Sequence, residues 1–215
     1  MFRSRKHTHA FTLVELLVSI SIFALMTTLV VAKYGNFNNN VLLTNAAYDV
    51  ALAIRTAQTY GLSVRSDDSG GFNNAYGVNF SIREIGEQIN ELSNIPNSQT
   101  IVTFSDLNAN GIYDQGEEIS YSTLRGGVRI LDIAATCCDS VACVTQCFNV
   151  GSSFDVVFKR PDPSAQMCSY NGSVAGRCGL IITAQIMISS PSGDYRFVSI
   201  RKNGQISVND SGLEE

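Results

Sequence analysis

The sequence predicts an α+β protein in which one long N-terminal helix packs on an antiparallel β-sheet. Two observations lead to this prediction. Apolar residues run almost without interruption from Phe11 to Ala32 and then recur at helical spacing as far as Leu62. Beyond residue 75, short stretches rich in β-branched and aromatic residues alternate with Gly-, Pro- or Asn-containing turns, as antiparallel strands do. With 45% hydrophobic and 16% charged residues among 215, the chain has a folded or membrane-anchored composition rather than a disordered one.

The second half of the predicted helix is amphipathic. Its apolar residues recur at spacings of four, three, four and three, on one helix face: Leu43, Ala47, Val50, Ile54 and Ala57. Gly61 supplies a C-terminal stop. Weak helix formers at 33–40, KYGNFNNN, leave two alternatives open, namely one softened helix or two helices joined by a loop. Residues 63–75 have a loop composition.

The remainder is predicted to be strands with one short helix. Apolar residues at helical spacing before Pro96 predict that helix: Ile82, Ile85, Ile89 and Leu92. The predicted strands are Tyr76–Ser81, Thr100–Ser105, Glu118–Ser122, Val128–Ile133, Phe154–Arg160, Leu180–Ile188, Tyr195–Arg201 and Gln205–Val208. The sequence therefore divides into a segment 1–10, a helix 11–62 and a β-rich globular domain 63–215.

The apolar run 11–32 is long enough to cross a membrane. As a helix it spans about 33 Å, against a hydrocarbon core of about 30 Å. Arg3, Arg5 and Lys6 precede it, so the positive-inside rule places residues 1–10 in the cytoplasm and the globular domain outside. Glu15 is the only charged residue in the run, and a plain transmembrane anchor does not explain it. A secretory signal peptide cut after Ala32 explains the basic start but is longer than the usual apolar region and rarely carries an acid.

The stretch HAFTLVELLVS closely resembles the cleavage site of type IV pilins and type II secretion pseudopilins. In that family a short basic leader ends in a small residue, the mature chain begins with Phe, and a Glu stands at its fifth position. Here Ala10, Phe11 and Glu15 occupy those places, although the family usually has Gly where this chain has Ala10. RTAQTYGLSVR and YGVNF also resemble, more loosely, the minor-pilin and H-type pseudopilin branch.

The resemblance implies a pilin-like fold and a role as a filament subunit. It implies that a membrane-embedded prepilin peptidase cuts after Ala10 and methylates the new amine of Phe11, and that inner-membrane machinery assembles the subunit with other pilins or pseudopilins. It also implies that Glu15 pairs with the N-terminal amine of a neighbouring subunit. Two opposite charges about 4 Å apart attract by about 4 kcal/mol at an effective dielectric of about 20, so an unpaired Glu15 penalises misplaced subunits. The alternative is a Glu15 that reaches the lipid headgroups.

Residues 106–117 match a calcium-loop pattern without a gap. Calcium prefers six to eight oxygen ligands, which a twelve-residue loop supplies from alternate positions. The predicted ligands are the side chains of Asp106, Asn108, Asn110, Asp114 and Glu117 and the backbone carbonyl of Ile112, and Gly111 permits the turn. Flanking strands exclude a helix–loop–helix site, and few carboxylates predict weak binding, on the order of 10⁻⁴–10⁻³ M. The alternative is an Asn- and Gly-rich hairpin with solvated acids.

All six cysteines lie in the segment 137–178. They are Cys137, Cys138, Cys143, Cys147, Cys168 and Cys178. An exported domain favours disulfides, and six cysteines allow fifteen pairings. We expect Cys168 to pair locally with Cys178, and the neighbours Cys137 and Cys138 to take different partners. A Cys₄ zinc site is weakened by the absence of a C-x₂-C pair, and reduced thiols are the third alternative.

Composition argues against several other functions. Both histidines lie within the first ten residues, so a mature chain that begins at Phe11 cannot build a Ser-His-Asp or Cys-His centre, and we expect no enzyme. Beyond residue 10 the chain has 12 basic and 19 acidic residues, a balance of −7, which argues against nucleic-acid binding and a DNA-uptake pilin. The main alternative is a secreted binding module stabilised by disulfides and calcium and released after Ala32.

Overall fold

The computed structural model describes residues 11–63, 74–83, 97–138, 143–145, 153–170, 180–210 and 212. Helix α1 (Leu13–Leu62) is helical throughout, so the weak helix formers at 33–40 do not interrupt it. The chain divides into two compact units, Met1–Asn38 and Asn39–Glu215. The predicted short helix falls largely at 84–96, outside the described residues.

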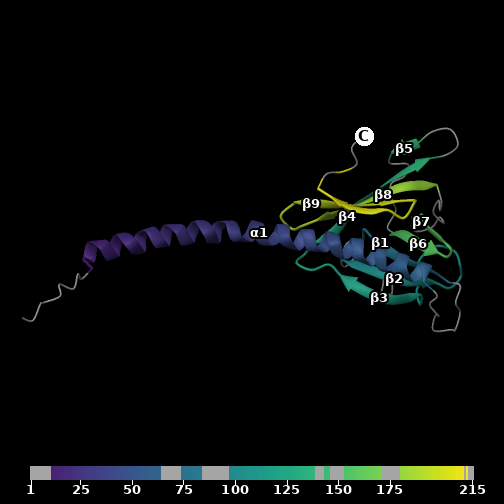
Figure 1. Ribbon diagram of the computed structural model, residues 1–215, viewed down its shortest axis with the longest axis horizontal. Helices are drawn as coiled ribbons and strands as arrows, with labels where there is room; N and C mark the ends of the chain where they lie inside the picture. Colours follow the sequence, from purple (N-terminus) through teal and green to yellow (C-terminus); the bar gives the residue numbers. More distant parts are fainter. Residues whose placement is uncertain are drawn as a thin grey trace, which may run out of the picture. The chain divides into compact units, whose positions relative to one another are not determined.

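The described strands of the second unit form two antiparallel five-stranded sheets (Figure 1). The first sheet has the order β3-β2-β1-β6-β7, with β1 Ala75–Ser81, β2 Thr100–Asp106, β3 Glu118–Thr123, β6 Ser153–Lys159 and β7 Asp162–Tyr170. The second sheet has the order β10-β9-β8-β4-β5, with β4 Arg129–Cys138, β5 Cys143–Thr145, β8 Ile181–Ser189, β9 Tyr195–Arg201 and β10 Ile206–Asn209. The expected fold class, a helix on antiparallel β-structure, is confirmed.

Every predicted strand is present, within a few residues at its ends, but β5, β7 and the division into two sheets were not predicted. Strand β7 has the sequence DPSAQMCSY, in which Pro163 and polar residues hide the strand pattern. Its place at the edge of the first sheet explains why a proline is tolerated, because an edge strand has one row of backbone groups that need no partner. Strand β5 has only three residues and is too short to give a pattern.

The second half of α1 packs against residues of both sheets. The five residues predicted to share one helix face are all 0% exposed: Leu43, Ala47, Val50, Ile54 and Ala57. They join one core cluster with residues of the first sheet, such as Phe80 and Phe158, and of the second sheet, such as Ile133 and Ile186. Since full burial of a Leu, Val or Ile side chain contributes about 1.5–3 kcal/mol, this apolar face holds the second half of the helix on the sheets.

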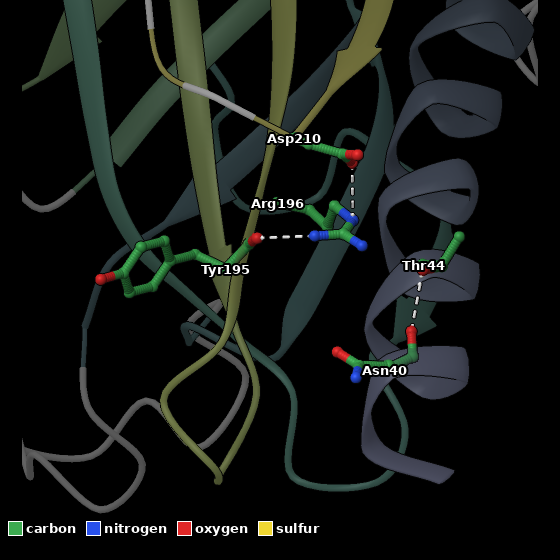
Figure 2. A network of polar contacts seen from close by, with 5 residues as sticks. All are labelled: Asn40, Thr44, Tyr195, Arg196 and Asp210. Atoms are coloured by element: carbon green, nitrogen blue, oxygen red, sulfur yellow. Dashed lines mark hydrogen bonds and ion pairs between the residues drawn. The ribbon is translucent and has the colours of Figure 1, made fainter. Parts of the chain in front are cut away.

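Polar contacts near the helix add little to this packing. Figure 2 shows Arg196 of β9, whose Nε lies 3.0 Å from Asp210 Oδ1 and whose Nη1 donates to the Tyr195 carbonyl at 3.2 Å. On α1, Thr44 Oγ1 donates to the Asn40 carbonyl at 2.8 Å, which satisfies its hydroxyl within the helix. Because the Asp210 side chain is 84% exposed, its ion pair is screened by water and contributes little to stability.

Candidate functional site

The first half of α1 is an apolar surface that the chain itself does not cover. Leu13–Ala32 is long and apolar enough to cross a membrane by length and composition, with a mean hydropathy of 2.3. Its large side chains are at least half exposed, from Leu17 at 51% to Leu13 at 74%, and Phe11 just before them is 78% exposed. So large an apolar surface on a folded chain requires lipid or other protein around it.

The polar side chains of this segment are compatible with an apolar environment. Four hydroxyl groups donate to backbone carbonyls one turn earlier in the helix: Ser19 to Glu15, Ser21 to Leu17, Thr27 to Phe23 and Thr28 to Ala24, at 2.6–2.9 Å. A hydroxyl that is satisfied within its own helix costs little in hydrocarbon. Glu15 is therefore the one side chain of 13–32 whose polarity the helix does not compensate.

Glu15 also has a local role at the start of the helix, which the sequence analysis missed. Thr12 stands immediately before α1, and its Oγ1 accepts the Glu15 backbone N–H at 3.2 Å. Thr12 and Glu15 have the T-x-x-E spacing of a capping box, and an acid in the first turn interacts favourably with the helix dipole. No described side chain pairs with the Glu15 carboxylate. Phe11 lies just before the cap, and Ala10 lies outside the described residues.

The calcium-type loop joins β2 to β3, as the flanking sequence predicted. Ser105 N–H donates to the Glu117 carbonyl at 2.9 Å and closes the loop at its base. Gly111 has a φ of 76°, which fits its expected role in the turn. Ala109 has a φ of 60°, an unfavourable value for a residue with a Cβ.

The predicted ligand side chains lie together, and backbone N–H groups hold their oxygens in place. Asp106 accepts from Asn110 N–H at 3.1 Å and from Gly111 N–H at 3.0 Å. The Oδ1 atoms of Asn108 and Asn110 accept from Asn110 N–H at 3.0 Å and from Ile112 N–H at 2.8 Å, respectively. Glu117 Oε1 accepts from Leu107 N–H at 2.9 Å, and Glu117 Oε2 accepts from Asp114 N–H at 3.1 Å.

Asp114 is held differently from the other acids. Its Oδ2 accepts hydrogen bonds from the side-chain amides of Asn108 and Asn110, both at 2.7 Å. Among the described residues no three acidic, Cys or His side chains stand close enough together to hold a metal as they are. Direct coordination by Asp114 therefore requires its carboxylate to exchange two amide donors for a cation.

The acidic side chains of the loop repel one another, and a bound cation would reduce this repulsion. Asp106 and Glu117 are only 4% and 7% exposed. Burial raises the pKa of Glu117, the N–H groups of Asp114 and Leu107 offset part of this, and the charges of Asp106 and Asp114 raise it further. A divalent ion among these groups would favour their charged forms.

A further carboxylate that the sequence analysis did not single out lies beside the loop. Asp155 of β6 is 0% exposed, and its Oδ1 accepts from Asn79 Nδ2 at 2.7 Å. Its Oδ2 has no hydrogen-bond partner among the described residues. Burial raises the pKa of Asp155 to about 7, with smaller contributions from the charges of Asp114 and Glu117. The only sequence signal was an acid inside the apolar strand FDVVF.

Tyr113 fastens the loop to the first sheet. Its ring packs against Phe104 with centroids 5.6 Å apart. Its hydroxyl donates to Glu118 Oε2 at 3.4 Å, and Gly116 N–H donates to the same atom at 2.8 Å. Burial raises the pKa of Tyr113, and its contacts with Tyr121 and Glu118 raise it further.

The structure places Cys137, Cys138 and Cys168 in disulfide bonds. Cys137 and Cys138 end β4, and Cys168 lies in β7 on the other sheet. Cys143 stands opposite Cys138 in the backbone register of β4 and β5. Cys147 and Cys178 fall outside the described residues. The expected connectivity, including the pair Cys168–Cys178, stays a prediction.

The comparisons with known proteins support the N-terminal segment alone. Residues 5–31 match the family model of the prokaryotic N-terminal methylation motif. No curated protein matches the chain, and no solved structure does. The match covers Phe11, Glu15 and nearly all of the uncovered apolar segment of α1.

Proposed function

We propose that this chain is a minor pilin or pseudopilin. The match of residues 5–31 to the N-terminal methylation motif supports a type IV pilin-like or pseudopilin-like protein. The chain is a structural subunit of a type IV pilus or of a type II secretion-like filament. The precursor is anchored by residues 11–32 with its N-terminus in the cytoplasm. Prepilin peptidase cuts it after Ala10, Phe11 is methylated, and the subunit joins a filament at the cell surface or in the periplasm.

One observation carries this proposal. The segment that matches the methylation motif is also the segment whose apolar side chains the chain leaves uncovered, while residues 39–215 form a separate compact unit with its own core. Lipid covers the segment before assembly, and the apolar helices of neighbouring subunits cover it afterwards.

In the filament, Glu15 pairs with the methylated amine of Phe11 in a neighbouring subunit. The helix satisfies its own hydroxyl groups but offers the Glu15 carboxylate no cation. Cleavage after Ala10 creates the missing positive charge. A subunit in the wrong register leaves both charges unpaired in an apolar environment and is rejected.

N-terminal sequencing and mass spectrometry of the protein from its native membrane test the cleavage. The expected mature chain begins with methylated Phe11. A mature chain that begins at Lys33 would instead establish the secreted-module alternative. Co-purification with other proteins that carry the same motif tests assembly.

We also propose that the loop 106–117 binds structural calcium. The supporting observation is that its side-chain oxygens are already positioned by backbone N–H groups while its buried acids repel one another. The carboxylate, amide and carbonyl donors suit a hard cation. Bound calcium would supply positive charge that neutralises the acids of the loop.

Melting in chelator and in calcium tests this second proposal. With a dissociation constant of about 10⁻⁴–10⁻³ M, about 10 mM calcium stabilises the fold by about 1.4–2.7 kcal/mol. For a domain of this size, that corresponds to a rise in melting temperature of about 3–11 °C. An identical melting temperature in both conditions would reject the site.

A further inference from the structure

The buried carboxylate Asp155 lies on the sheet face that the calcium-type loop covers. In the β6–β7 ladder Asp155 is paired with Cys168 and Val157 with Gln166, and paired residues share a sheet face. Gly111 of the loop lies against this face, because a Cβ on Gly111 would stand 3.0 Å from Gln166 Nε2 and 3.6 Å from Cys168 Sγ. The middle of the loop therefore lies over Asp155.

Tyr113 brings the loop backbone to the Asp155 carboxyl group. Its side chain packs on the small cluster of Ala75, Phe104 and Val157 on the same face of the first sheet. Its backbone lies close enough to the Asp155 carboxyl group for the N–H dipole to lower the pKa of Asp155. Asn79 holds Asp155 from the neighbouring strand at 2.7 Å and also donates to Ser153 Oγ at 2.6 Å, so the carboxyl group has a fixed position.

The Tyr113 N–H belongs to the same peptide group as the Ile112 carbonyl, which is the predicted backbone ligand of the loop. In a planar trans peptide the N–H and the C=O point in opposite directions. When Asp155 attracts the Tyr113 N–H, this peptide turns the Ile112 oxygen away from the sheet. A negative charge at the N–H end also increases the partial negative charge on that oxygen.

We propose that Asp155 is a positioning residue of the cation site: from below the loop its carboxylate attracts the Tyr113 N–H and thereby turns the Ile112 carbonyl toward a divalent ion in the loop. The proposal rests on the calcium site proposed above and adds to it a residue outside the loop. It also accounts for Asp155 Oδ2, a fully buried oxygen without a hydrogen-bond partner among the described residues. A nearby cation compensates such a charge, and partners of this kind commonly govern metal affinity.

The test compares three full-length proteins in detergent: the wild type, Asp155→Asn, and Asp132→Asn as a matched control. Asp132 is an exposed residue of β4 in the other sheet, so the control removes the same charge far from the loop. Calcium affinity is measured from the rise in melting temperature during a calcium titration and from the luminescence of terbium(III) bound in its place. We expect Asp155→Asn to weaken binding by about 10–100-fold and Asp132→Asn to leave it unchanged.

The melting temperature in chelator separates positioning from general support of the fold. Asp155→Asn removes a buried charge, so above pH 7 in chelator it should melt no lower than the wild type. Asp155→Ser, which is smaller and also neutral, provides a second variant that fits the same space. If either folded variant binds calcium as tightly as the wild type does, the role of Asp155 is overturned while the calcium site stands. If the wild type binds neither ion, both proposals fail.

Discussion

Gly61 is the position where the packing of α1 makes the sharpest prediction. In an ordinary helix, alanine is better than glycine by about 0.8–1.0 kcal/mol. Here, however, a Cβ on Gly61 would lie 2.5 Å from the Phe158 carbonyl oxygen and 2.9 Å from both its carbonyl carbon and its Cβ. Phe158 belongs to β6, which has neighbours on both sides in the first sheet, so its backbone cannot turn aside.

The replacement Gly61→Ala must therefore push the end of α1 away from the sheet. Overpacking of this kind costs about 1–3 kcal/mol, which exceeds the gain in helix propensity. We expect a net loss of up to about 2 kcal/mol and a melting temperature lower by up to about 8 °C.

Thermal melting of the full-length protein in detergent at fixed calcium measures this effect. Thr59→Ala is the control, because Thr59 is an exposed residue two positions earlier in the same helix. It should leave the melting temperature equal or slightly higher. A Gly61→Ala protein that melts at or above the wild type would refute the inference that the close contact between α1 and β6 is rigid.

Three further predictions concern Glu15, Ala109 and Asp155. Glu15→Ala should leave the melting temperature of the globular domain unchanged but abolish incorporation into filaments. Normal incorporation of this variant, measured by immunoelectron microscopy, would contradict the proposed pairing of Glu15. Ala109→Gly should raise stability by about 0.5–1 kcal/mol in a urea titration, since it relieves a φ of 60°; a drop in stability would contradict this. In chelator, the raised pKa of Asp155, about 7, means that the folded protein retains a proton that the unfolded chain releases near pH 4. Stability should then fall between about pH 4 and pH 7, by at most about 1.4 kcal/mol per pH unit, and Asp155→Asn should remove that slope; an unchanged slope in the variant would show that other groups cause it.

Much of the fold was predictable because it follows from local periodicity. Leu43 and Ile54 lie on one helix face by spacing alone, and both are completely buried. The strands around the calcium-type loop were predictable for the same reason. Periodicity could not give the two sheets, because strand order depends on contacts between residues far apart in the sequence. Strand β7 was missed because its edge position, which a sequence does not show, is what permits Pro163 there.

The calcium-type loop was likewise predictable only in part. Its pattern, from Asp106 to Glu117, is a local motif with fixed spacing, and backbone N–H groups of the same loop bind its side-chain oxygens. The partners below the loop are not local. Asp155 and Asn79 come from β6 and β1, and only the pairing of those strands brings them together under Tyr113.

The sequence by itself determined the match of residues 5–31 to the N-terminal methylation motif, because the basic residues, Phe11, Glu15 and the apolar run are contiguous and their spacing carries the signal. It likewise determined which face of α1 is buried. Only the tertiary structure decided which polar groups that are distant in the chain come into contact. For an acid inside an apolar strand, such as Asp155, burial and neighbouring charges set the free energy of its charged form. Both depend on the groups that the fold places against it.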